Sequence, residues 1–278
     1  MEHDSETQRA VNALLALVGP EDAARLRERT GVGAPGEGIP EGWAAGRQIG
    51  HVGVPASAYL WMLETDDPEI NALVYRTDRA GRAVQRDIRR GLPFAPGARG
   101  QLPVSPDVLL GDEPEGLRDF GPDGVVPALR RATTMRRGRA AADAVQRADW
   151  ERVVAADAEQ ALPGYARWAL ALRIDCPDEL RERFSGHPGF AHKMRWGGIV
   201  DGPATYALTA RPARDVLALL ETGRWAFPAR LPQAQEVLRP LVHGSLGTGT
   251  EAWAVLAQLL PTFTGTVPEL IVTAGAIA

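Results

Sequence analysis

The sequence predicts an all-α protein, organised as an irregular α-solenoid or helical-repeat array of short helices. Apolar residues recur three and four positions apart along most of the chain, which is the spacing of one helix face. Proline and glycine interrupt these segments at short intervals, and the alternating pattern of β-strands is nearly absent. Helices this short are marginally stable alone, so we expect them to hold one another through packed faces.

The clearest group of predicted helices lies between residues 162 and 198. Pro177 suits the start of a second helix and Pro188 the start of a third, and Gly197 and Gly198 end the group. The first helix of the group is indicated by apolar residues on one face, namely Tyr165, Trp168, Ala169 and Leu172.

The same order of proline, helix, polar break and helix recurs between Val54 and Arg76. There Pro55 opens one helix, and Asp67 is a suitable N-cap for a second helix that starts at Pro68. Shorter forms of the pattern begin at Ser105 and at Thr266.

The run ALALRIDCPDELRERFSGHPGFAHKMR resembles a unit of the leucine-rich repeat variant family, which is related in style to HEAT repeats. The resemblance implies short helices stacked into an α-solenoid. It implies no common activity and no catalytic residues, so none is assigned on this ground. Irregular spacing of the repeats is indicated by prolines that share no exact period, namely Pro55, Pro177 and Pro268.

The composition of loops predicts the domain organisation. Residues 1–50 read as a helix pair followed by a Gly- and Pro-rich loop or mobile linker from Gly31 to Gly50, and residues 51–278 read as the helical-repeat domain. A loop-rich internal boundary is predicted at 91–124. That stretch is locally acidic, with Asp112, Glu113, Glu115 and Asp119 close together.

Composition also bounds the function. With 278 residues and a formal net charge of -4, the chain is not built as a whole to bind nucleic acid or anionic lipid. No apolar run reaches the ~18–20 residues that span a bilayer, and the polar N-terminus does not read as a secretory signal. The single cysteine, Cys176, excludes an internal disulfide and favours the reducing cytoplasm.

Arginine provides the sharpest candidate for a binding surface. Lys193 is the one lysine among 31 basic residues, which indicates a coding bias, so the number of arginines alone carries no function. Their arrangement between residues 79 and 90 is more specific, because at 100° per residue five arginines fall within an arc of roughly 100°. These are Arg79, Arg82, Arg86, Arg89 and Arg90, which Arg136, Arg137 and Arg139 would extend if the two helices are neighbours.

Two interpretations of this stripe stay open. One is a solvated helix face, and the other is a site for an anionic partner, either nucleic-acid phosphates or an acidic protein surface. No catalytic motif, cofactor motif or metal site is predicted. His187 and His192 are five residues apart, which does not place both on one helix face. Cys176 lies at a helix start, where a thiol pKa can be lowered, but cysteine is also a common small buried residue.

The sequence therefore predicts a non-catalytic binding or scaffold module of helical-repeat type that recognises a protein partner. The first alternative is a nucleic-acid-binding helical-repeat protein that uses the arginine-lined helix. The second is an enzyme of unrecognised class with a site near Cys176.

Overall fold

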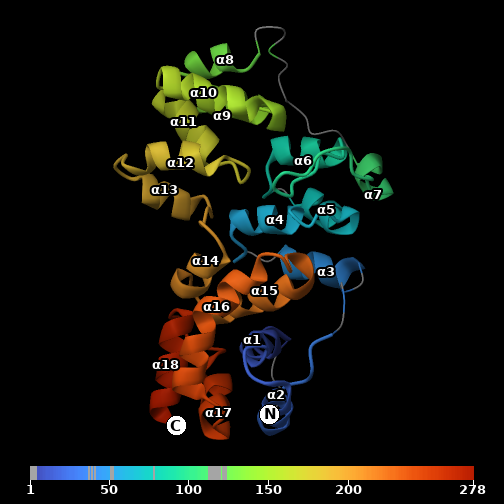
Figure 1. Cartoon of the computed structure of the whole chain (residues 1–278), viewed down its shortest axis with the longest axis vertical. Coiled ribbons are helices and arrows are strands. Elements are labelled where there is room, and N and C mark those ends of the chain that lie inside the picture. Colours follow the sequence, from blue (N-terminus) through green and yellow to red (C-terminus); the bar gives the residue numbers. More distant parts are fainter. Residues whose placement is uncertain are drawn as a thin grey trace. The chain divides into compact units, whose positions relative to one another are not determined.

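The computed structural model describes residues 5–36, 38, 40, 42–50, 53–77, 79–111, 120 and 124–278, and among these it leaves out the side chains of residues 42, 43 and 47. This part of the chain contains helices and no strand, so the predicted all-α class is confirmed (Figure 1). No helix within it is long and apolar enough to cross a membrane. The acidic cluster from Asp112 to Asp119 lies outside the described residues.

The chain forms two compact units. Unit 1 combines residues 1–54 with residues 200–278, and unit 2 is the continuous stretch 55–199 between them. The sequence-based division after residue 50 stays a prediction. One part of it is wrong, because the segment expected to be a loop up to Gly50 contains a helix, α3, at Gly42–Ile49.

Unit 1 is built from helices of both ends of the chain. Beside α3, its helices are α1 (Ser5–Leu15), α2 (Pro20–Thr30), α14 (Pro203–Thr209), α15 (Ala213–Ala226), α16 (Leu231–Leu241), the π-helix η3 (Val242–Leu246), α17 (Thr250–Leu259) and α18 (Val267–Ile277).

The core of unit 1 forms where the N-terminal helices pack on the C-terminal ones. Helix α1 lies against α15, and α2 lies against α17. Val11, Leu14 and Leu15 follow the helical spacing of α1 and are buried in this contact. Helix α18 begins with a capping box, in which Thr266 and Glu269 satisfy each other's backbone N–H groups.

Unit 2 is a succession of shorter helices. They are α4 (Ala56–Leu63), α5 (Pro68–Tyr75), α6 (Arg82–Arg89), α7 (Pro106–Leu110), α8 (Val126–Arg130), α9 (Met135–Ala144), the 3₁₀-helix η2 (Arg147–Asp149), α10 (Trp150–Glu159), α11 (Gly164–Ala171), α12 (Asp178–Ser185) and α13 (Phe190–Trp196). The most extensive packing joins α9 with α11, and smaller contacts join α4 with α5, α5 with α6, α8 with α9, α11 with α12 and α12 with α13.

Local sequence explains where these helices begin. Asp67 caps α5 as predicted, because its Oδ1 accepts hydrogen bonds from the backbone N–H groups of Glu69 and Ile70 at 2.8 and 3.2 Å. The three helices expected between residues 162 and 198 are present as α11, α12 and α13. Pro188 does not start α13, however. Gly189 follows it with a φ of 79°, and the helix begins at Phe190.

Candidate functional site

The predicted arginine stripe does not form one solvated face. Arg79, Arg82 and Arg90 are exposed and Arg89 is half-buried, but Arg86 is only 7% exposed. The expectation of a solvent-facing row is therefore wrong at Arg86. Helical spacing places Arg86 on the polar side of α6. The end of α9 contacts α6 and covers part of that side.

Arg86 binds the C-terminal end of α9. Its Nη2 donates to the Val145 carbonyl at 3.1 Å, and its Nη1 donates to the Asp143 carbonyl at 3.3 Å. Its Nε donates to the carboxylate of Asp87 at 3.0 Å. The last carbonyls of a helix have no partner within the helix, so the Arg86 guanidinium replaces the water that these buried groups would otherwise bind.

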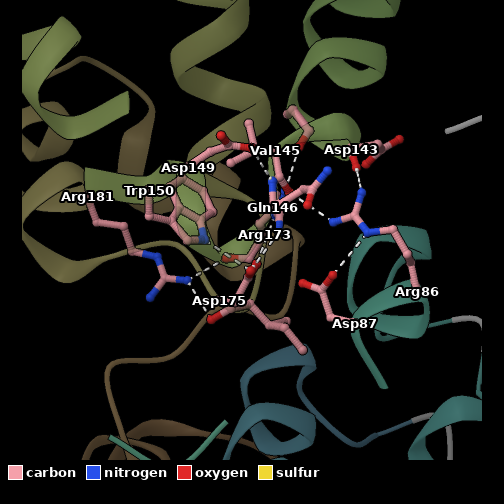
Figure 2. Close-up of polar contacts among 12 residues, drawn as sticks. Arg86, Asp87, Asp143, Val145, Gln146, Asp149, Trp150, Arg173, Asp175 and Arg181 are labelled. Carbon is pink, nitrogen blue, oxygen red and sulfur yellow. Dashed lines mark hydrogen bonds and ion pairs between the residues drawn. The ribbon is translucent and has the colours of Figure 1, made fainter. Parts of the chain in front are cut away.

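A second arginine reaches the same helix end. Nη1 of Arg173 donates to the carbonyls of Ala142 and Val145 at 2.5 and 2.7 Å. Its other nitrogens form a two-pronged ion pair with Asp175, at 2.8 and 2.6 Å. Figure 2 shows the guanidinium groups of Arg86 and Arg173 both directed at the segment between residues 142 and 146.

Trp150 and Arg181 complete this buried polar cluster. The indole N–H of Trp150 donates to Asp175 at 3.2 Å, and the Arg173 guanidinium lies 4.8 Å from the centre of the Trp150 ring (Figure 2). Arg181 donates to the backbone carbonyls of Arg173 and Ile174 at 2.6 and 3.1 Å. The cluster therefore fixes the turn between α11 and α12 against the end of α9.

The two carboxylates of the cluster differ in their electrostatics. Burial alone would raise the pKa of Asp175, but the charge of Arg173 and the hydrogen bonds from Arg173 and Trp150 outweigh it, and the pKa is lowered. Burial dominates at Asp87 and raises its pKa despite the charge of Arg86. One oxygen of Asp87, Oδ2, is buried without a hydrogen-bond partner. Asp175 is thus held ionised, whereas the contacts of Asp87 compensate only in part for the burial of its carboxylate.

Arg89 has a similar structural role at another helix. Its Nη1 donates to the carbonyls of Val108 and Gly111, both at 2.7 Å, and its Nη2 donates to the Leu109 carbonyl at 3.2 Å. These carbonyls form the end of the single-turn helix α7. Arg89 therefore holds α7 beside the stripe, and its guanidinium is largely committed to that contact.

The arginines of α9 are arranged differently. Arg136, Arg137 and Arg139 are all exposed, and the side chains of Arg136 and Arg137 form no ion pair or hydrogen bond within the described part of the chain. Gly138 between them faces the opposite way, against the backbone of Tyr165 in α11, where an added Cβ would overlap the Tyr165 carbonyl. We refer to Arg136, Arg137 and Arg139 as the α9 arginine face.

Contact between α6 and α9 links this face to the predicted stripe. The charges of Arg82 from α6 and Arg139 from α9 both act on Asp143, so the two helices bring these arginines near one carboxylate. Burial nevertheless raises the pKa of Asp143. Of the eight predicted arginines, Arg82 and Arg139 are both within electrostatic reach of Asp143, whereas Arg86 and Arg89 are in structural contacts.

The residues weighed as catalytic or metal-ligating do not converge. Cys176 is 4% exposed, and burial raises the pKa of its thiol to about 12, the opposite of what a nucleophilic thiolate needs. His187 is exposed, and its ring lies edge-on to Trp168 with 5.0 Å between the ring centres. Within the described residues, no group of three histidine, cysteine, aspartate or glutamate side chains is placed to hold a metal ion.

Sequence reasoning missed Arg173, Asp175 and Trp150. The local signal is the Arg-x-Asp spacing directly before Cys176-Pro177, at the turn between two helices. It could indicate an ion pair, but nothing in the sequence tells that the pair is buried against α9. No known protein family, curated protein or solved structure matches this chain, so the geometry alone carries the functional interpretation.

Proposed function

We propose that this chain is a non-catalytic binding module, and that its α9 arginine face recognises an acidic surface of a protein partner. One observation carries the proposal. Arg136 and Arg137 lie in the first turn of α9, where the partial positive charge of the helix end disfavours cations, and that turn contains no acidic residue. Helix stability therefore does not account for these arginines, and their guanidinium groups are unpaired within the described residues.

The neighbourhood of the face supports a protein partner. The three side chains of the face are exposed, whereas Gly138 packs the opposite side of α9 on α11, so the face is free to meet a partner. Arginine is enriched among the residues that dominate the affinity of protein interfaces. The planar guanidinium forms paired hydrogen bonds with carboxylates and sheds water more readily than a lysine ammonium does.

The helical-repeat character belongs to the same proposal. In unit 2 the packing contacts run mostly between helices close in sequence, as in proteins whose repeats stack one on the next. We extend the resemblance to leucine-rich repeat variant and HEAT-like units to this unit only, because α1 and α15 of unit 1 pack together from opposite ends of the chain. The single, unpaired and buried Cys176 supports a reducing, cytoplasmic location.

Nucleic acid is the second candidate partner, because unpaired guanidinium groups also bind phosphates. The formal net charge of -4 weighs against it, since long-range attraction of a polyanion needs positive potential. An enzyme with a site near Cys176 ranks last. The buried thiol and the separate position of His187 beside Trp168 give no base-activated nucleophile.

The test is affinity capture with a charge-reversed face. Arg136, Arg137 and Arg139 are changed together to Glu, and the tagged variant and wild type are used to capture proteins from nuclease-treated extracts of the native cells. We expect wild type to retain an acidic protein that the variant loses, and the wild-type complex to dissociate as salt is raised, because the contact is electrostatic.

The matched control carries the same change of charge elsewhere. Arg29, Arg99 and Arg195 are exposed and unpaired within the described residues, so their triple change to Glu alters the net charge equally. Equal loss of the partner in both variants would contradict a specific face. If wild type captures the partner from untreated extract but not from nuclease-treated extract, and labelled duplex or single-stranded nucleic acid binds wild type but not the α9 variant, the second candidate replaces the first.

A further inference from the structure

Helix α13 is fixed to α11 by one of its sides. The Phe190 ring stacks on the Trp168 ring with 5.8 Å between their centres. Nζ of Lys193, one turn further along α13, lies 4.2 Å from the centre of the same indole. Met194 is buried on this side as well. These contacts determine which side of α13 is left for solvent.

The solvent side of α13 carries His192, Arg195 and Trp196, which we call the α13 outer face. They are spaced i, i+3 and i+4, so they share one side of the helix, and all three are exposed. Their side chains form no hydrogen bond, ion pair or ring contact within the described residues. Trp196 is 84% exposed, whereas the other tryptophan side chains that the structure describes are buried or half-buried. Packing therefore does not account for the position of Trp196.

The charges carried by this part of the chain are all positive. No aspartate or glutamate occurs between Glu182 and Asp201, a stretch that includes the whole of α13. Arg195 and Lys193 therefore have no carboxylate near them in sequence, and an anionic partner complements the face. Because the whole chain has a formal net charge of -4, the attraction is confined to short range.

The exposed indole distinguishes one class of anion from the others. The α9 arginine face offers guanidinium groups only, whereas the α13 outer face offers a cation beside a flat aromatic ring. Each nucleotide of a single strand supplies one phosphate and one unpaired planar base, which match Arg195 and Trp196. An acidic protein surface supplies the charge without the ring, and a duplex keeps its bases stacked on one another.

We propose that the α13 outer face binds single-stranded nucleic acid, with a base stacked on the Trp196 indole and a neighbouring phosphate on Arg195. The contact tolerates any sequence, because every base has a π-face. The site lies on a different helix from the α9 arginine face and does not rest on the proposed protein partner.

The probe is fluorescein-labelled oligo(dT) of about 12 nucleotides, within the site sizes of single-strand-binding modules. Binding to the full chain is measured by fluorescence anisotropy at several salt concentrations. We expect saturable binding with a dissociation constant on the order of 10⁻⁵ M, which weakens as salt is raised. A duplex of the same length should bind at least about fivefold more weakly, because its bases are not free to stack on Trp196.

Two variants test the two halves of the contact. Trp196→Ala should weaken oligo(dT) at least about fivefold, whereas Trp196→Phe should retain most of the affinity because a phenyl ring also stacks. Arg195→Gln should make the plot of log affinity against log salt shallower by about 0.7, the contribution of one single-strand phosphate.

Matched controls change exposed side chains of the same kinds elsewhere. Tyr165→Ala removes an exposed ring from α11, and Arg29→Gln removes an exposed arginine from α2. Both should bind oligo(dT) as wild type does. The variant with the charge-reversed α9 arginine face should also bind it unchanged, which separates this site from the proposed protein partner.

Several results would overturn the proposal. These are the absence of saturable binding, unchanged affinity in Trp196→Ala, and equal affinity for duplex and single strand. Displacement of oligo(dT) by poly-glutamate at equal concentrations of charge would assign the face to acidic proteins instead. Loss of oligo(dT) in the α9 variant but not in Trp196→Ala would place the nucleic acid on the α9 arginine face.

Discussion

Two groups of arginines meet α9 in opposite ways. At its C-terminal end, Arg86 and Arg173 are buried and donate to carbonyls of the helix end. In its N-terminal half, Arg136, Arg137 and Arg139 are exposed, and the helix end there is the one that disfavours cations. The same residue type thus stabilises one end of the helix, while the other end carries it without a structural reason.

The comparison shows how a protein of short helices uses arginine. Each helix end leaves several carbonyls without an internal partner, and short helices multiply such ends. Arg89 serves α7 in this way, Arg130 donates to carbonyls at the end of α10, and Arg181 does so at the end of α11. Arginine reaches these carbonyls from another helix with several donors, so it joins neighbouring elements as it caps them.

The largest expected effect is at the buried end. Changing Arg173 to Ala leaves Asp175 buried without its ion pair and frees two carbonyls, so we expect the free energy of unfolding to fall by about 3–5 kcal/mol. Urea-induced unfolding measures it. Arg137→Ala on the exposed face is the control and should change the value by less than about 0.5 kcal/mol. Similar losses of unfolding free energy in Arg173→Ala and Arg137→Ala would contradict the division into buried structural arginines and exposed arginines without a structural role.

A smaller effect is expected where α9 touches α11. Gly138→Ala places a Cβ against the Tyr165 carbonyl, so the helices must separate, and we expect a loss of about 1–3 kcal/mol in the same unfolding experiment. Gly164, at the start of α11, has no atom near an added Cβ. Gly164→Ala should therefore be neutral or stabilise by up to about 1 kcal/mol. A neutral Gly138→Ala would mean that the α9 and α11 backbones are not in close contact.

Asp87 and Asp175 of the buried cluster should contribute to the free energy of unfolding with opposite pH dependence. The pKa of Asp175 is lowered, so the unfolded chain binds its proton first, and stability is lost as pH falls below the ordinary value of 3.8. The pKa of Asp87 is raised, so the folded chain binds its proton first, and stability is gained as pH falls toward 3.8.

Asp175→Asn and Asp87→Asn isolate these contributions. Relative to Asp175→Asn, wild type should lose stability as the pH falls below 3.8. Relative to Asp87→Asn, wild type should gain stability as the pH falls toward 3.8 from above. Unfolding free energies measured across this pH range give the two slopes. Slopes of the same sign would show that Asp87 and Asp175 share one environment, contrary to the contacts described.

The sequence predicts local structure well and long-range contacts poorly. Proline and glycine between residues 162 and 198 predict the three helices that are present, although the third starts two residues after Pro188, and Asp67 is the predicted N-cap, because these signals act within a few residues. The polar periodicity predicts Arg86 on an exposed face, either solvated or binding an anionic partner, but the carbonyls it binds come 57 and 59 residues later. The packing of α1 on α15 likewise depends on residues about 200 positions apart, which no local pattern encodes.

The most direct measurement is the unfolding free energy of the chain with Arg136, Arg137 and Arg139 changed together to Glu. If these arginines serve binding and not the fold, acidic residues near the start of α9 will leave stability unchanged or raise it by up to about 1 kcal/mol, because they suit the helix end better. A loss of about 2 kcal/mol or more would show that the α9 arginine face holds the fold, and would contradict its assignment as a recognition surface.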